Sequence, residues 1–246
     1  MDYGALARSY QTLFYANDLK KLLNAVCRDD SFADMSKKEL HGKVNELLFS
    51  NYGGEWVIKY HLAANFLRKD FTAAFEVKAK RSRVDFLAVN GFTHAFEVKS
   101  SLDNLSRIGK QTNDYKDVFE FNTVVADGTH FEKIRGAVPD YYGIWVVENG
   151  KRTIIREASL SPALQPDAQL GVMTRKEKRS AFGSMDAAEI TEQQPASAIN
   201  LKFKEVLKKR YQERWEFVQM NWNHILPVDL QFFFNTNIDP RLIYQD

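Results

Sequence analysis

The fold is decided by residues 83–99, which read Arg83-Val84-Asp85-Phe86-Leu87-Ala88-Val89-Asn90-Gly91-Phe92-Thr93-His94-Ala95-Phe96-Glu97-Val98-Lys99. Two runs rich in β-branched and aromatic residues enclose Asn90-Gly91, a dipeptide typical of two-residue hairpin turns. Antiparallel pairing about this turn brings Asp85 into the neighbourhood of Glu97. Side chains on a strand alternate between faces, so Glu97 and Lys99 point the same way, about 7 Å apart along the backbone. The segment therefore predicts a hairpin on which two carboxylates and an ammonium group converge.

This combination of side chains suits the cleavage of a phosphodiester bond. Asp85 and Glu97 can hold a hard divalent cation through oxygen ligands. Such a cation polarises a phosphate and lowers the pKa of a bound water. Lys99 can orient or deprotonate that water, or offset the charge that builds up on the phosphate.

The same residues resemble the PD-(D/E)xK nuclease superfamily, whose pattern is an acid on one strand followed by acid-x-lysine on the next. Asp85 matches the first acid, Glu97 and Lys99 match the pair, and Val98 would offer its carbonyl to the metal. Val84 stands where the family often has proline. The resemblance covers about residues 45–130 and is to a small, mostly uncharacterised bacterial branch. It implies an αβββαβ restriction-endonuclease-like core, Mg²⁺ with Mn²⁺ as a possible substitute, and DNA as substrate.

Two further site residues are implied by the resemblance. The helix before the first strand often supplies a glutamate, for which Glu55 is the first choice and Glu46 the reserve. Some branches carry a glutamine on the helix after the lysine strand, where Gln111 stands. The alternatives stay open: Glu55 as an acid favoured at a helix N-terminus, Gln111 as an exposed amide, and Glu97 with Lys99 as a salt pair on a solvent-facing strand. The repeated tetrapeptide 75–78 is interpreted as an ordinary strand.

The remaining chain predicts an α/β fold, a mixed central sheet flanked by helices, with helical regions before and after the core. We expect three parts: an N-terminal helical segment (1–50), the nuclease core (51–160), and a helical, aromatic extension packing on the core (161–246). Helices are expected at 5–28, 36–49, 55–68, 103–118, 129–137 and 199–220, and strands at 71–80, 83–90, 92–100, 121–126, 142–147 and 153–158, the last two around the turn Glu148-Asn149-Gly150. Residues 161–198 are expected to form loops around one short helix, and the aromatic tail 221–246 to pack on the body or on a second subunit.

Composition limits the partners. The chain has 34 basic and 32 acidic residues, a net charge of +2, so a nucleic-acid site must be local. The candidate phosphate contacts are Lys78, Lys80, Arg81, Arg83 and Lys110. The single cysteine, Cys27, excludes an internal disulfide framework. The absence of a signal-peptide pattern and of a long apolar stretch predicts a cytoplasmic protein without a membrane segment.

The sequence thus predicts a metal-dependent nuclease that hydrolyses phosphodiester bonds in DNA. The small net charge suggests that it forms a homodimer around its substrate or is delivered by a partner protein. The alternative is a nucleic-acid-binding or interaction module on the same fold without turnover. The retention of Asp85, Glu97 and Lys99 argues against that alternative.

Overall fold

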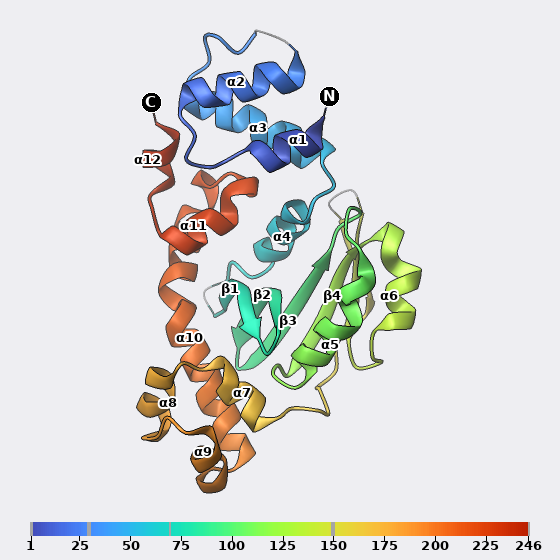
Figure 1. Cartoon of the computed structure of the whole chain (residues 1–246), viewed down its shortest axis with the longest axis vertical. Coiled ribbons are helices and arrows are strands. Elements are labelled where there is room, and N and C mark those ends of the chain that lie inside the picture. Colours follow the sequence, from blue (N-terminus) through green and yellow to red (C-terminus); the bar gives the residue numbers. More distant parts are fainter. Residues whose placement is uncertain (1, 29–30, 69, 149–150, 246) are drawn as a thin grey trace.

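The computed structural model describes residues 2–28, 31–68, 70–148 and 151–245, and its centre is a mixed sheet of six strands (Figure 1). The strands lie in chain order across the sheet. β1–β2, β2–β3 and β5–β6 pair antiparallel, whereas β3–β4 and β4–β5 pair parallel. The strands are β1 (Thr72–Ala79), β2 (Ser82–Asn90), β3 (Phe92–Lys99), β4 (Phe121–Asp127), β5 (Gly143–Glu148) and β6 (Lys151–Arg156). The predicted class, a mixed α/β sheet flanked by helices, is confirmed.

The helices occupy both sides of this sheet and both ends of the chain. α5 packs on β2 and β4 and α6 on β4 and β5, while α10 and α11 pack on β1. The helices are α1 (Tyr3–Ser9), α2 (Ala16–Cys27), α3 (Lys37–Asn51), α4 (Glu55–Ala64), α5 (Ile108–Lys116), α6 (Phe131–Ala137), α7 (Pro166–Val172), α8 (Arg175–Phe182), α9 (Ala187–Gln193), α10 (Ala196–Asn221), α11 (Leu230–Thr236) and α12 (Pro240–Tyr244). In chain order, α4 and β1 precede residues 83–99 of β2 and β3, and α5 and β4 follow them.

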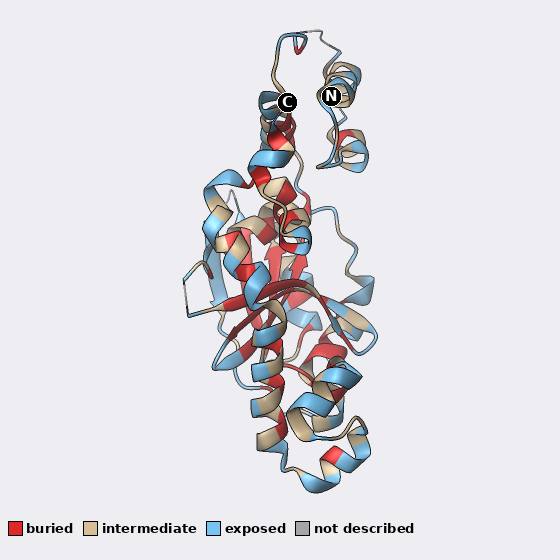
Figure 2. Cartoon of the chain, turned by 90° about the vertical axis from the view of Figure 1, so that its left-hand side faces the viewer, coloured by how far each residue is buried: buried red, intermediate tan, exposed pale blue. Residues whose placement is uncertain are grey.

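The C-terminal region shares one hydrophobic core with the sheet. Phe75, Phe86 and Phe96 of the first three strands belong to the same buried cluster as Trp215 of α10 and Phe234 of α11. The rings of Phe75 and Phe234 meet edge to face at 5.3 Å between centroids. Figure 2 shows buried residues concentrated in the central sheet, while α10 alternates between buried and exposed positions along its length. The boundaries expected at residues 50 and 160 stay predictions.

The N-terminal helices form a second cluster around Leu19, Leu23 and Leu40. The expected single helix 5–28 is wrong, because the chain breaks between α1 and α2. Tyr10 and Thr12, which lie in the break, donate hydrogen bonds to the buried Asp229 at 3.0 and 2.6 Å. A tertiary partner more than two hundred residues away therefore overrides the local helical pattern.

Other local expectations differ in detail. The stretch 161–198 holds three short helices, α7 to α9, rather than one. Each begins with a local signal: Pro166 in the first turn of α7, a capping box of Thr174 with Glu177 on α8, and Asp186 as the cap of α9. The Asn149-Gly150 turn expected between the last two strands lies outside the described residues.

The hairpin between β2 and β3 is tighter than a two-residue turn. Asn90 pairs with Phe92, which leaves Gly91 alone at the tip with φ of +70°. Glycine reaches this left-handed region without steric cost. The shift by one residue sets the register of the ladder, whose last pair is Phe86 with Phe96. Asp85 and Glu97 are the next residues in the same register, just beyond that pair, so they lie on one level.

Candidate active site

Two nearly identical octapeptides flank β2 at the same level. Residues 71–78 read FTAAFEVK and residues 92–99 read FTHAFEVK, so they differ only at their third position. Phe86 of β2 pairs with Phe75 on one side and Phe96 on the other, and the neighbouring residues follow the same register. Glu76, Asp85 and Glu97 consequently occupy one level across β1, β2 and β3. The octapeptide symmetry thus gives Asp85 a glutamate on each side.

Asp85 is held by the backbone of β3. Its Oδ2 accepts a hydrogen bond from the Val98 N–H at 2.7 Å. Its side chain is only 14% exposed. The bond fixes the carboxylate beside the Glu97–Val98 peptide unit, so that Asp85, Glu97 and the Val98 backbone lie together.

Glu97 is buried and oriented through both of its oxygens. Lys99 Nζ donates to Oε1 at 2.5 Å, and the Tyr115 hydroxyl of α5 lies 2.6 Å from Oε2. Glu97 and Lys99 are 2% and 6% exposed. Glu97 and Lys99 therefore form the ion pair that the alternative interpretation expected. The pair is buried beneath α5, however, and does not lie on a solvent-facing strand.

A lysine on α4 joins the carboxylates from the other side. Lys59 Nζ lies 2.7 Å from Glu76 Oε1, 3.2 Å from Glu55 Oε1 and 3.5 Å from Asp85 Oδ1. Lys59 is 3% exposed. Neither Lys59 nor Glu76 was expected at the site. Their signals in the sequence are the i,i+4 spacing of Glu55 and Lys59 on one helix face and the recurrence of the octapeptide.

The crowding of buried acids shifts their protonation. Burial first, and then repulsion by Glu97, raise the pKa of Asp85 to about 8. Burial also raises the pKa of Glu97, against the attraction of Lys99. Burial alone would lower the pKa of Lys59, yet Asp85, Glu55 and Glu76 outweigh it and raise this pKa above its ordinary value. A cation placed among the acids would relieve their repulsion.

The acids open into a cavity of about 370 Å³. Gln111 reaches this cavity from α5, and its buried Oε1 has no hydrogen-bond partner within the described part of the chain. Glu55 also lines it, whereas the reserve Glu46 is not among the lining residues, and its exposed side chain pairs with Lys43 on α3. The lining residues are Glu55, Asp85, Glu97, Val98, Lys99, Asp103, Asn104, Ser106, Arg107 and Gln111.

A basic cavity of about 540 Å³ adjoins the acidic one, and the two share Arg107 and Gln111. All five residues expected to contact phosphates line it. Lys80 pairs with Asp117 at its rim, and Lys110 donates to the Arg81 carbonyl. The lining residues are Lys78, Lys80, Arg81, Ser82, Arg83, Arg107, Lys110 and Gln111.

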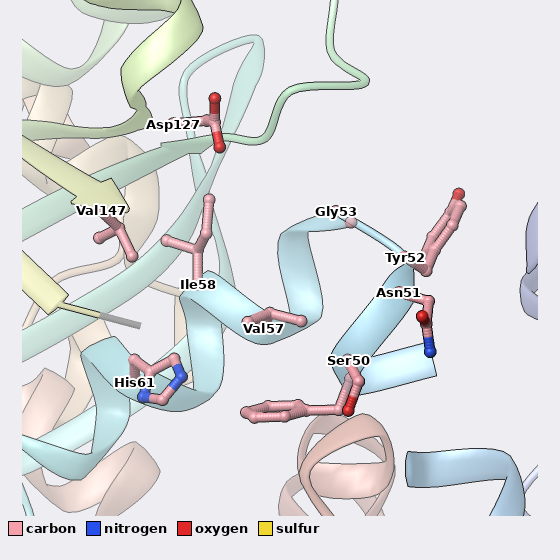
Figure 3. A pocket seen from close by; sticks show the side chains of 11 residues that line it. Ser50, Asn51, Tyr52, Gly53, Val57, Ile58, His61, Asp127 and Val147 are labelled. Atoms are coloured by element: carbon pink, nitrogen blue, oxygen red, sulfur yellow. The ribbon is translucent and has the colours of Figure 1, made fainter. Parts of the chain in front are cut away.

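A separate cavity of about 610 Å³ shares no lining residue with the acidic one (Figure 3). Its walls come from the end of α3, the start of α4, and strands β4 and β5. Asp127 is its single carboxylate, and its Oδ1 already accepts hydrogen bonds from Thr129. No lysine or arginine lines it, so it lacks the basic groups that would hold a phosphate beside an acidic site.

Within the described ranges, no three His, Cys, Asp or Glu side chains are grouped as ready-made metal ligands. At this site the Lys59 ammonium contacts three of the acids. In the same ranges no helix has the length and apolar character needed to cross a bilayer.

Three comparisons place the chain among known proteins. The family model described as bacteriophage P4 protein cII matches residues 56–233. No curated protein matches. A solved structure, the SPO1766 protein of unknown function from Silicibacter pomeroyi, is 16% identical, covers 51% of this chain and 89% of its own, and superposes with a TM-score of 0.36. A likeness this weak carries no argument about fold or function.

Proposed function

The chain belongs to the bacteriophage P4 protein cII family, and we propose that it is a divalent-metal-dependent nuclease that hydrolyses phosphodiester bonds in DNA. The observation that carries this proposal is the convergence of Asp85, Glu97 and Lys99 in one cavity beside a basic cavity. Buried acids with raised pKa values, set in a cleft, are typical of sites that act on ligands.

The topology supports a restriction-endonuclease-like core. α4, β1, β2, β3, α5 and β4 follow one another in the αβββαβ order that the resemblance implies. The three strand pairings among them are antiparallel, antiparallel and parallel. In this arrangement α4 carries Glu55, β2 carries Asp85, β3 carries Glu97 and Lys99, and α5 carries Gln111.

The donors fit a hard divalent cation. Asp85, Glu97 and the Val98 carbonyl would hold it, with Glu55 as a further acid, and all of these donors are oxygen atoms. Mg²⁺ is characteristically held by one or two carboxylates together with waters and phosphate oxygens, so Asp85 and Glu97 would suffice as its acidic ligands. A cation bound there would supply Lewis-acid activation of water and of the phosphate. We propose Mg²⁺, with Mn²⁺ as a substitute.

The chain's own groups have separable roles in this proposal. Lys99 is pinned against Glu97, where its positive charge orients the attacking water and stabilises charge on the phosphate. Tyr115 positions Glu97 through its hydroxyl. The unpartnered Gln111 Oε1 is available to accept a hydrogen bond from that water.

The basic cavity would hold the DNA backbone next to the acids. Lysine and arginine contacts to phosphates position a nucleic acid without reading its sequence. Arg107, which lines both cavities, would bridge the bound strand and the reacting phosphate. DNA as the substrate, a homodimer or partner protein, and a cytoplasmic location remain proposals that rest on the sequence.

A second candidate is a nucleic-acid-binding module on the same fold without turnover. It is favoured by the ammonium groups of Lys59 and Lys99, which already neutralise part of the acidic charge. On that alternative the basic cavity would bind nucleic acid and the row of acids would be structural.

Cleavage of supercoiled plasmid, linear duplex and single-stranded DNA with Mg²⁺, Mn²⁺ or EDTA tests the proposal. We expect metal-dependent cutting by the wild type, abolished in Asp85→Asn and Lys99→Ala. Lys43→Ala is the control, since Lys43 pairs with Glu46 on α3 outside both cavities. Binding without cutting under every condition would favour the second candidate. Cutting that survives both substitutions would reject the assigned site.

A further inference from the structure

The two octapeptides place equivalent glutamates beside Asp85 but neutralise them differently. Glu97 is paired by Lys99 of its own strand at 2.5 Å. Glu76 is paired at 2.7 Å by Lys59 of α4, while its own Lys78 is exposed and lines the basic cavity. The sequence around the glutamate is identical in both peptides, so the local sequence does not explain why the two glutamates have different partners.

The backbone of Glu76 gives the reason. Its φ is +56°, a left-handed conformation within a strand, and the β1–β2 ladder skips the pair of Glu76 with Asp85. Non-glycine residues rarely adopt this conformation, and those that do cluster at functional sites. The distortion turns the Glu76 carboxylate toward Lys59, which thereby gains three acidic neighbours.

We propose that the Lys59 ammonium permanently occupies the side of Asp85 that faces Glu55 and Glu76, in place of a metal ion. The chain therefore binds a single divalent ion, on the side of Asp85 that faces Glu97. This inference rests on the proposed metal-dependent function. Lys59 is 3% exposed and held by three carboxylates. A second divalent ion on that side would have to displace a buried, multiply paired charge, which is costly.

The charge balance agrees with one ion. When all four carboxylates are ionised around a bound cation, Glu55, Glu76, Asp85 and Glu97 face the two buried ammonium groups of Lys59 and Lys99, which leaves a formal charge of −2. The guanidinium of Arg83, 3.8 Å from Glu76, is largely exposed and screened by solvent, so this balance does not include it. One divalent cation neutralises the formal charge that remains. A second would leave an excess of +2 in a largely buried site. Without Lys59 the uncompensated charge becomes −3, and a second ion becomes favourable.

The number of Mn²⁺ ions bound by the chelator-treated, full-length protein tests this inference without any assay of cleavage. Equilibrium dialysis and the loss of the free-Mn²⁺ electron paramagnetic resonance signal both give this number. We expect one ion per chain for the wild type, two for Lys59→Met, and one for the control Lys43→Met. In the double variant Lys59→Met with Glu76→Gln the second ion should be lost again.

Two ions per wild-type chain would overturn the inference, and this measurement does not depend on a variant. One ion in Lys59→Met, whatever its affinity, would also overturn it. Lys59→Gln provides a polar replacement with the same expected stoichiometry if the methionine variant does not fold. No binding by any protein would overturn the metal-dependent function as well, whereas one ion bound by all would overturn only the role of Lys59.

Discussion

The octapeptides of β1 and β3 are a natural comparison within one chain. Both present a glutamate next to Asp85 and a lysine two residues later, from FTAAFEVK at 71–78 and FTHAFEVK at 92–99. In β3 the glutamate is 2% exposed and its lysine 6%. In β1 the Glu76 side chain is 25% exposed, and the lysine faces a different cavity.

The cause of the difference is the position of each strand. β3 lies between β2 and β4, and Tyr115 of α5 closes over Glu97, so its backbone is fixed on both edges. β1 lies at one edge of the sheet and, among the described strands, pairs with β2 alone, which leaves it free to distort at Glu76. An identical tetrapeptide therefore acquires the proposed catalytic role in one strand and a supporting role in the other. Motif matching alone cannot make that distinction.

Substitution of the two lysines should give the largest contrast. We expect Lys99→Ala to reduce the cleavage rate about 10²- to 10⁴-fold, as for loss of a group that acts on the reacting atoms. Lys78→Ala should reduce it less than about tenfold, because Lys78 would contact only a phosphate of the bound strand. Single-turnover cleavage at saturating Mg²⁺ measures both. Equal losses would mean that the strands are functionally equivalent and would end the distinction.

The pH dependence of stability should distinguish Asp85 from ordinary surface acids. Because its pKa is raised to about 8 in the folded protein, against about 3.9 when unfolded, the folded state retains a proton that the unfolded state has lost. Protonated Asp85 therefore stabilises the folded protein fully below about pH 4, and this contribution to the free energy of unfolding is lost as the pH rises toward about 8. In EDTA, the free energy of unfolding of Asp85→Asn relative to wild type should increase by about 1 kcal/mol per pH unit within this window.

Urea unfolding of both proteins at several pH values gives this difference. Asp140→Asn is the control, since that carboxylate is fully exposed and touches only Arg156. A difference between Asp85→Asn and wild type that does not vary from pH 5 to pH 8 would show that Asp85 is ionised throughout. The site would then tolerate its repulsion without a bound cation.

Tyr115 provides a smaller test, of positioning. Tyr115→Phe removes the hydroxyl that lies 2.6 Å from Glu97 Oε2 and should slow cleavage about 3- to 30-fold, with the larger loss at subsaturating Mg²⁺. The matched control is Tyr142→Phe, which removes a buried hydroxyl that donates to the Thr112 carbonyl on the same helix. Both changes should cost about 1 kcal/mol of stability. If both slowed cleavage alike, Tyr115 would have no role beyond stability.

Much of this arrangement could be predicted from local sequence rules. The two-residue alternation of strands puts Glu97 and Lys99 on one face, and the Asn90-Gly91 hairpin signal brings Asp85 to within one residue of Glu97. The tighter turn of the structure supplies the remaining one-residue shift. The helix expected at 36–49 is also confirmed, and it begins at a capping box that Ser36 forms with Glu39. These features depend on residues close in the chain, where propensity and spacing act directly.

The remainder depends on contacts that no local rule encodes. Lys59 reaches the acids only because α4 lies across the strands, and Glu76 joins them only through a left-handed backbone conformation. The break between α1 and α2 is fixed by Asp229, at the other end of the chain. The helices α7 to α9 are a different case, because their N-terminal signals are local and stand in the sequence. The polar composition of the segment led to the prediction of loops instead.

The smallest expected effect concerns the basic cavity. It tests whether Lys78, the lysine of the β1 octapeptide, contacts DNA. If Lys78 contacts a DNA phosphate, Lys78→Ala should weaken DNA binding a few-fold and reduce the slope of log K against log salt concentration by about 1. Fluorescence anisotropy with a labelled duplex, in Ca²⁺ to suppress cleavage, measures that slope. Lys43→Ala should leave the slope unchanged. Lys99→Ala should lower the affinity for DNA without reducing the slope by the same amount, because the Lys99 ammonium is paired with Glu97. A slope that Lys78→Ala does not change would show that Lys78 does not contact a DNA phosphate. The distorted strand β1 would then contribute to the site through Glu76 and not through Lys78.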